Sequence, residues 1–172
     1  ILSQGTPFFQ AGEEMLRTKP DGKGGFDDNS YRASDGINAL KWADLSKPEY
    51  RSNVEYYKGL LAFRKAHPAL RLQTREAVLD AVKPVAADDP QTAAYLIDER
   101  ILVIFNASAK DVTVSLPEGT WNLNIFDNTA GNDTIDRHNL TVVHIAVNSQ
   151  CIVTVLTVAG CGIDRTCHNR ID

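Results

Sequence analysis

The apolar residues of the chain divide it into a helical stretch and a longer stretch of alternating character. Between Ser46 and His67 they recur every three or four positions, which is the period of one face of an α-helix. Ser46 and Glu49 have the spacing of a capping box, and Pro68 disfavours helical backbone at His67. We therefore predict an amphipathic helix from Ser46 to His67, in which Arg64 and His67 are structural rather than catalytic. Its apolar stripe consists of Tyr50, Val54, Tyr57, Leu60, Leu61 and Phe63.

From about Glu76 onward the apolar residues alternate with polar ones, which is the period of a β-strand with one buried face. Turn-forming residues separate these segments, and many short strands at such spacing predict an antiparallel β-sandwich. Trp121 shares its face with Leu123 and Ile125, so we expect the indole in the core. The expected strands span residues 93–97, 101–105, 112–116, 121–125, 140–147 and 152–158.

The first stretch, residues 5–42, begins with a strand pattern and continues as a long polar loop. Phe8 and Phe9 are strand-forming aromatic residues and Gly12 is a common strand terminator, so we expect a strand over residues 6–12. The loop after it mixes both signs of charge with polar side chains. This composition suits a neutral ligand that is rich in hydroxyl groups, such as a sugar. The polar candidates are Asn29, Tyr31, Asp35 and Asn38.

Composition and charge exclude several classes of partner. Hydrophobic residues make up 43% of the 172 residues and charged residues 23%, which is ordinary for a globular protein, and the net charge is −4. No basic face is implied, so we expect no nucleic-acid partner. No apolar run approaches the about 20 residues that cross a bilayer, so we expect no membrane partner. The sequence opens without a methionine or a leader, and it leaves the compartment open between secreted and cytoplasmic.

No motif for a cofactor or a metal ion stands out, and we expect neither. The glycine-rich run at residues 22–25 lacks the spacing of a phosphate-binding loop. Asp21, Asp27 and Asp28 do not follow the calcium-loop pattern, which also needs a glutamate at its end.

The C-terminal residues 160–172 do not continue the strand pattern. Cys161, Cys167 and His168 fall short of the four closely paired ligands of a zinc site. The two cysteines form either a small disulfide loop or part of an unstructured end, while Cys151 opens an apolar strand and is expected to be a buried thiol. Three cysteines do not fix the redox compartment.

Short sequence motifs follow one another through residues 4–42 in a characteristic order. They are QGTPFF at residues 4–9, AGEE at 11–14, LRTK at 16–19, NSY at 29–31, DGIN at 35–38 and a closing Trp42. In this order they resemble the loop after the eighth barrel strand of the α-amylase superfamily, and they are most similar to type I pullulanases. Those enzymes cleave α-1,6 branch points in pullulan, glycogen and limit dextrins. Residues 20–26, PDGKGGF, depart from the pattern and look like an insertion.

The resemblance implies an α/β part followed by an all-β part. Residues 1–75 correspond to the last strand, loop and helix of a (β/α)8 barrel, residues 76–159 to a C-terminal antiparallel β-sandwich, and residues 160–172 to a tail that is open to disorder. No linker rich in glycine or serine lies at the boundary, between residues 72 and 78. A complete barrel needs roughly 250 residues. We therefore expect the C-terminal part of a longer enzyme, with the missing N-terminal barrel of the same polypeptide as its partner.

In that superfamily the catalytic carboxylates follow the fourth, fifth and seventh barrel strands, so the resemblance assigns no catalytic residue to this chain. Glycoside hydrolysis needs two carboxyl groups flanking one bond. Glu13 and Glu14 do not meet this need, because adjacent residues of a strand point to opposite faces. One of them is instead expected to bond nearby backbone or Arg17.

The resemblance places the loop along the non-reducing side of the cleavage point. Tyr31 would pack against a pyranose ring, and Asp35 and Asn38 would bind hydroxyl groups. Arg17 and Asn29 would hold the loop in shape. The alternative is that Asp35 and Asn38 make only turn and cap bonds.

The expected function is that of a pullulanase fragment that binds an α-glucan with α-1,6 branches. One alternative is a fragment of an isoamylase or of a glycogen-debranching enzyme. Another, from a different class, is a non-catalytic carbohydrate-binding or structural β-sandwich module. A cluster of exposed aromatic residues on the sandwich would favour the binding module.

Overall fold

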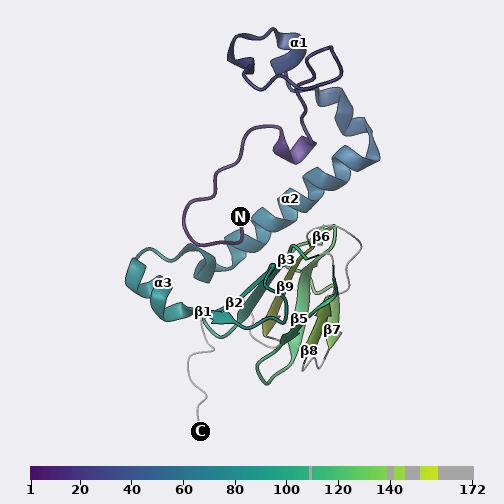
Figure 1. Ribbon diagram of the computed structural model, residues 1–172. Coiled ribbons are helices and arrows are strands. Elements are labelled where there is room, and N and C mark those ends of the chain that lie inside the picture. The colour runs from purple at the N-terminus through teal and green to yellow at the C-terminus, as the bar shows by residue number, and fades with distance from the viewer. Residues whose placement is uncertain (109, 139–141, 146–151, 159–172) are drawn as a thin grey trace. The chain divides into compact units, whose positions relative to one another are not determined.

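The computed structural model describes residues 1–108, 110–138, 142–145 and 152–158 (Figure 1). The chain divides into two compact units, one made of residues 1–7 with 58–172 and the other of residues 8–57. The boundary falls inside helix α2 (Pro48–Ala66), so each unit includes part of this helix. The predicted tail, residues 160–172, lies outside the described residues, as do Cys151, Cys161, Cys167 and His168.

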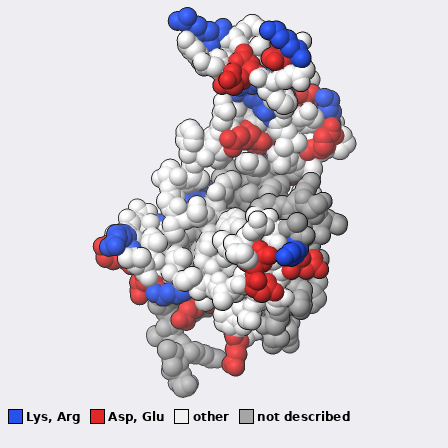
Figure 2. Space-filling model, viewed as in Figure 1, with Lys and Arg blue, Asp and Glu red and all other residues white. Residues whose placement is uncertain are grey.

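The unit of residues 8–57 is built from short helical turns joined by loops. In chain order these are η1 (Glu13–Met15), η2 (Ser30–Arg32), α1 (Asp35–Asn38), η3 (Trp42–Ser46) and the first part of α2. Around α1, Lys and Arg side chains lie beside Asp and Glu side chains and do not form a patch of one sign (Figure 2). The loop therefore has the mixed charge that its sequence predicted.

The expected strand at residues 6–12 is absent from the structure, and that prediction is wrong. The segment has no strand, and Phe8 is 95% exposed. A strand needs a neighbour with which to exchange N–H···O=C bonds, and no described segment pairs with this one. A sequence pattern favourable to a strand is not sufficient without that neighbour.

Helix α2 begins two residues later than expected because Ser46 belongs to η3. The Ser46 hydroxyl donates to the carbonyl oxygen of Ala43 at 2.8 Å, so the predicted capping box is wrong. Pro48 occupies the first helical position, where its missing N–H costs nothing. The helix ends at Ala66, and His67 has φ −112° and ψ 91°, as expected for a residue before proline.

Burial on α2 differs from the predicted stripe. Leu60 and Phe63 are buried, but Leu61 is 40% exposed, so it lies off the buried face. Arg64 is buried instead, with 6% of its surface exposed. The long aliphatic part of an arginine fits an apolar face when its guanidinium finds acceptors.

Arg64 finds those acceptors in the first residues of the chain. Its Nη1 donates to the carbonyl oxygens of Ile1 at 2.6 Å and Ser3 at 2.7 Å, and its Nη2 donates to that of Gly5. The hydroxyl of Tyr95 donates to the carbonyl oxygen of Leu2 at 3.3 Å. Arg64 is thus structural, as predicted, and the structure shows that it ties residues 1–5 to α2.

Two short helices follow α2, namely η4 (Pro68–Arg71) and α3 (Arg75–Ala81). The sequence predicted strand-like alternation from Glu76, and this is wrong as far as Ala81. Thr74 explains the difference, because its Oγ1 accepts the N–H of Ala77 at 3.1 Å and caps the helix.

The rest of the described chain forms two antiparallel sheets (Figure 1). The seven-stranded sheet has the order β1-β2-β3-β9-β5-β6, with β7 also paired to β5, and the second sheet pairs β4 with β8. The predicted strands are confirmed where they are described. The strands are β1 (Val82–Val85), β2 (Thr92–Ile97), β3 (Ile101–Asn106), β4 (Val112–Ser115), β5 (Trp121–Phe126), β6 (Thr129–Ala130), β7 (Asp136–His138), β8 (Val142–Ile145) and β9 (Ile152–Val158).

The core of the sandwich contains residues from both sheets. Trp121 is 1% exposed, as predicted, and its Nε1 donates to the carbonyl oxygen of Pro117 at 3.1 Å. Val112 and Val114 of β4 are fully buried with Leu102 and Ile104 of β3 in the same cluster. Alternating residues of β4 therefore face the larger sheet, as expected for a strand with one buried face.

Strand β5 carries an irregularity where its pairing with β9 shifts register between Leu123 and Ile125. Asn124 lies at this shift and is 3% exposed. Its Oδ1 accepts the hydroxyl of Thr157 at 2.8 Å, and its Nδ2 donates to the carbonyl oxygen of Asn132 at 3.2 Å. A buried amide is tolerated here because both of its ends are hydrogen-bonded.

Candidate functional site

The adjacent glutamates at the start of the loop have structural contacts. They lie in η1 rather than on a strand, so the alternating directions of side chains along a strand do not apply to Glu13 and Glu14. The Oε2 of Glu14 accepts the N–H of Gly12 at 2.9 Å, and Asn53 donates through Nδ2 to the carbonyl oxygen of Glu14 at 2.9 Å. A carboxylate that bonds nearby backbone is one of the two roles expected for this pair, the other being a bond to Arg17.

Gly12 is required by the space around it as well as by its backbone. Its φ of 99° lies in the left-handed region, and an added Cβ would stand 2.6 Å from Cδ of Arg17 and 2.8 Å from Cδ2 of Leu40. The glycine therefore allows the Arg17 side chain to lie directly against the backbone.

Arg17 joins the two ends of the loop. Its Nη2 donates to the carbonyl oxygen of Asn38, at the end of α1, and its Nη1 donates to that of Ala11 at 3.3 Å. Its Nε is buried and has no hydrogen-bond partner among the described residues. Because two of its nitrogens bond main-chain carbonyls, Arg17 acts on the shape of the loop.

Asn38 is also engaged with the loop itself. Its Nδ2 donates to the carbonyl oxygens of Ser30 at 2.7 Å and Ala33 at 3.0 Å. Both amide hydrogens are therefore used to close the turn that carries Tyr31, and Oδ1 is the part of the side chain left for a ligand. The structure thus brings Arg17, Asn38 and the η2 turn into one hydrogen-bonded frame.

Tyr31 projects from this frame and is 74% exposed. The guanidinium carbon of Arg32 lies over its ring, 5.3 Å from the centroid. One face of the ring is therefore partly covered by a cation, and the other is available to a flat apolar surface such as a pyranose face.

Asp35 and Asn29 are exposed on the same loop. Asp35 is the first residue of α1, and within the described residues its carboxylate accepts no hydrogen bond. The N–H of Asn29 donates to Oδ1 of Asp27 at 3.0 Å, while its own side chain makes no cap bond to η2. Asp35 is thus a free charged acceptor, and Asn29 contributes its backbone to the turn.

Lys19 and Ser30 have roles in the loop that no sequence pattern indicated. Lys19 donates through Nζ to Oγ of Ser30 at 2.6 Å, and Ser30 is only 6% exposed. A lysine in a polar loop is normally solvated, so its sequence position alone does not identify such a bond.

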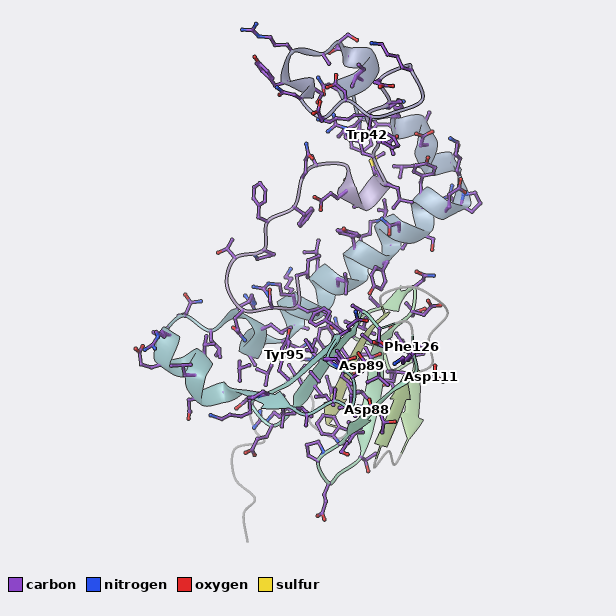
Figure 3. All side chains as sticks on the ribbon, in the orientation of Figure 1. Trp42, Asp88, Asp89, Tyr95, Asp111 and Phe126 are labelled. Carbon is purple, nitrogen blue, oxygen red and sulfur yellow. The ribbon has the colours of Figure 1, made fainter. Side chains whose placement is uncertain are left out.

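A cavity of about 240 Å³ lies beside the frame. Arg17, Leu40, Lys41, Asp44 and Tyr50 are among the residues that line it. On its rim Lys47 donates to Oδ1 of Asp44 at 2.8 Å, and this bond raises the pKa of the Lys47 amine. Trp42, the first residue of η3, is labelled in Figure 3. Its side chain is 64% exposed.

The described part of the sandwich shows structural acidic residues and no exposed aromatic cluster. Asp88 accepts the N–H of Thr113 at 3.0 Å, and Asp89 accepts the hydroxyl of Ser108 at 3.1 Å, so these acidic residues fasten loops between strands (Figure 3). In the described strands no aromatic side chain is among the exposed large apolar residues. The cluster that would have favoured a carbohydrate-binding module is therefore missing from this part of the chain.

The described residues contain no group of three His, Cys, Asp or Glu side chains arranged to hold a metal ion. None of the helices described has the length and apolar character needed to span a bilayer.

Comparison with known proteins first shows similarity to a class of relatives named as debranching enzymes or pullulanases. The chain is 28% identical over 142 residues to a glycogen debranching enzyme of Pectobacterium carotovorum, covering 75% of this chain and 20% of that protein. Within the class the similarity to pullulanases is higher. The pullulanase of Bacillus subtilis is 33% identical over 124 residues, which are 68% of this chain and 16% of the relative.

Family and structural comparisons agree with this. Residues 91–129 match the family described as the pullulanase all-beta domain. The pullulanase of Bacillus acidopullulyticus superposes with a TM-score of 0.78 at 27% identity, over 91% of this chain and 19% of the other. A pullulanase from Anoxybacillus sp. LM18-11, complexed with maltotetraose, gives a TM-score of 0.73 at 26% identity, over 91% and 22%. The resemblance to pullulanases is thus confirmed, and the chain spans a minor part of each relative.

Proposed function

We propose that the chain is part of a pullulanase-type enzyme that hydrolyses α-1,6-glucosidic linkages, and that residues 8–57 carry part of its glucan-binding surface. Residues 1–75 would belong to a (β/α)8 barrel, to which they contribute a loop and the last helix, residues 76–159 would form the sandwich domain, and residues 160–172 a tail. The catalytic carboxylates would lie on the remainder of the polypeptide. Glycogen debranching enzymes are the less similar relatives, so the pullulanase assignment is preferred.

One observation carries the binding proposal: some polar side chains of the loop bond its backbone, and others are left exposed. Arg17 and Asn38 donate hydrogen bonds to main-chain carbonyl groups, and these bonds hold the turn that presents Tyr31. Tyr31 and Asp35 are left exposed, one as an aromatic surface and the other as an unbonded carboxylate. An apolar ring face together with a charged acceptor is the pair of features with which proteins bind sugars, whose rings have apolar faces and hydroxyl edges.

The maltotetraose complex of a similar pullulanase supports an α-1,4-linked glucan as the ligand class. The proposal is tested by titrating the chain with maltotetraose and following the amide signals of residues 29–38 by NMR. Tyr31→Ala and Asp35→Ala should each weaken binding, whereas Glu118→Ala, an exposed change on the sandwich, should leave it unchanged. Equal affinity in all four proteins would contradict the proposal.

A further inference from the structure

Residues 20–26, which depart from the motif pattern of the loop, fold as a small hairpin. Pro20 and Phe26 form an antiparallel bridge. The N–H of Asp21 donates to the carbonyl oxygen of Gly25 at 3.1 Å, and the N–H of Asp27 donates to that of Lys19 at 2.9 Å. The inserted residues therefore leave and re-enter the loop at a closed base.

The tip of the hairpin is defined by its own hydrogen bonds. Oδ1 of Asp21 accepts the N–H groups of Lys23 at 2.7 Å and Gly25 at 3.0 Å. Gly22 and Gly24 have φ values of 76° and 92°, a conformation that residues with a Cβ rarely adopt. Both the side chain of Asp21 and the two glycines thus favour one conformation of the tip.

Lys19 connects the hairpin to the proposed binding turn. Its carbonyl oxygen accepts from Asp27, next to Phe26, and its Nζ donates to Ser30, next to Tyr31. Phe26 and Tyr31 therefore each lie next in sequence to a residue that is hydrogen-bonded to Lys19. They are 71% and 74% exposed, so neither ring is used in the core of its unit.

Binding residues lie disproportionately on loops, and aromatic residues are enriched at binding interfaces. We infer that Phe26 is a specificity-determining residue that extends the proposed glucan site, packing its ring against the apolar face of a glucosyl unit beyond the one at Tyr31. This inference rests on the proposed function, because the ligand and the position of Tyr31 within the site come from it. The occupant is the same glucan chain, since both rings are adjacent to residues that Lys19 links by hydrogen bonds.

The test compares a short and a long ligand on the 172-residue chain. Dissociation constants for maltotriose and maltoheptaose are measured by NMR titration for the wild type, Phe26→Ala, Phe26→Leu, Phe26→Trp and Tyr31→Ala. Both Phe26→Ala and Phe26→Leu should weaken maltoheptaose binding roughly two- to tenfold and change maltotriose binding less than twofold. Phe26→Trp should restore the wild-type constant, and Tyr31→Ala should weaken both ligands. Lys23→Ala, at the hairpin tip, is the matched control and should change neither.

The amide signals of Asp21 and Asp27 report whether the hairpin stays folded in each variant. Phe26→Leu keeps apolar bulk at the bridge, so its loss of affinity reports the ring and not the hairpin. Wild-type maltoheptaose affinity in Phe26→Leu, or equal losses for both ligands, would overturn the inference. If Tyr31→Ala alone weakens binding, the inference fails and the proposed function stands. If no protein in the series binds either ligand, both fail.

Discussion

The α-carbon of Gly59 on helix α2 lies directly against the carbonyl group of Ala130 on strand β6. A Cβ added to residue 59 would stand 1.9 Å from the Ala130 oxygen and 2.5 Å from its carbonyl carbon. Both residues belong to the unit of residues 1–7 and 58–172. Only glycine permits this approach of a helix to the backbone of a strand.

Gly59→Ala should therefore destabilise the protein, although alanine favours helices over glycine by about 1 kcal/mol. Overpacking against backbone typically costs about 1–3 kcal/mol, and we expect a net loss in that range in urea unfolding. Gly131→Ala is the control, because the nearest atom to its added Cβ is 3.9 Å away. A more stable Gly59→Ala protein would mean that the helix and β6 are not in this contact.

His67 should make stability depend on pH. Burial lowers its pKa, and the smaller opposing effect is its hydrogen bond with the carbonyl oxygen of Phe63. The folded protein thus favours the neutral ring, whereas the unfolded chain titrates near pH 6.5. The stabilisation is fully present above pH 6.5 and is lost as the pH falls from there toward the lower folded pKa.

Urea unfolding at pH 7.5 and pH 5.0 measures this dependence. The His67→Phe variant keeps a ring that can stack on Phe63 but does not titrate. In the wild type the centroids of the His67 and Phe63 rings are 4.0 Å apart. The wild type should lose more stability than this variant between the two pH values. Equal losses would show that the imidazole is as easily protonated in the folded protein as in the unfolded chain.

Asp35 and Asn38 should respond differently to substitution in the complete enzyme. Asp35→Ala removes a charged acceptor that bonds no described residue. It should lower kcat/KM for a branched substrate roughly 10- to 100-fold, from about 1.5–3 kcal/mol per charged hydrogen bond. Its melting temperature should be close to that of the wild type. An unchanged kcat/KM would rule out Asp35 as a substrate contact.

Asn38→Ala should instead lower the melting temperature, because the carbonyl groups of Ser30 and Ala33 lose their donor. Activity should fall as well, through loss of the frame that holds Tyr31. Thermal unfolding and kinetics on the same preparation separate the two effects. If Asn38→Ala loses activity without any loss of stability, its Oδ1 acts on the substrate and the frame is not limiting.

The chain by itself should not hydrolyse pullulan. Glu14 bonds the backbone of Gly12, and no catalytic carboxylate is assigned to these residues. Purified chain is incubated with pullulan and the release of reducing ends is measured. Turnover that survives purification and disappears in Glu13→Gln or Glu14→Gln would place the chemistry in this chain.

Strands β2, β3, β4, β5, β8 and β9 were predictable because each is set by local alternation between turns, whereas β1, β6 and β7 were not predicted. Trp121 could be assigned to the core from its neighbours alone. Helix α3 could not be predicted, since it depends on one cap at Thr74 and its sequence also fits the pattern of a strand. The strand expected at residues 6–12 failed for the opposite reason, because pairing requires a second segment that the local pattern does not supply.

The sequence predicted that Arg17 holds the loop in shape, but it left open whether Asn38 binds hydroxyl groups or closes a turn. The motifs pointed to Arg17, Asn29, Tyr31, Asp35 and Asn38 as a group. Which of them bond the backbone depends on contacts between residues that are distant in sequence, such as Arg17 with Asn38. The bond between Lys19 and Ser30 is likewise a product of the folded loop.

The attachment of residues 1–5 to α2 constrains its two sides unequally. In this segment Arg64 donates hydrogen bonds only to the main-chain carbonyl groups of Ile1, Ser3 and Gly5. Every amino acid carries such a carbonyl group. The side chain of Ser3 can therefore vary without loss of this contact, while position 64 needs a long side chain with a planar set of donors. For this contact the constraint therefore falls on a single helical position, and not on the side chain of Ser3.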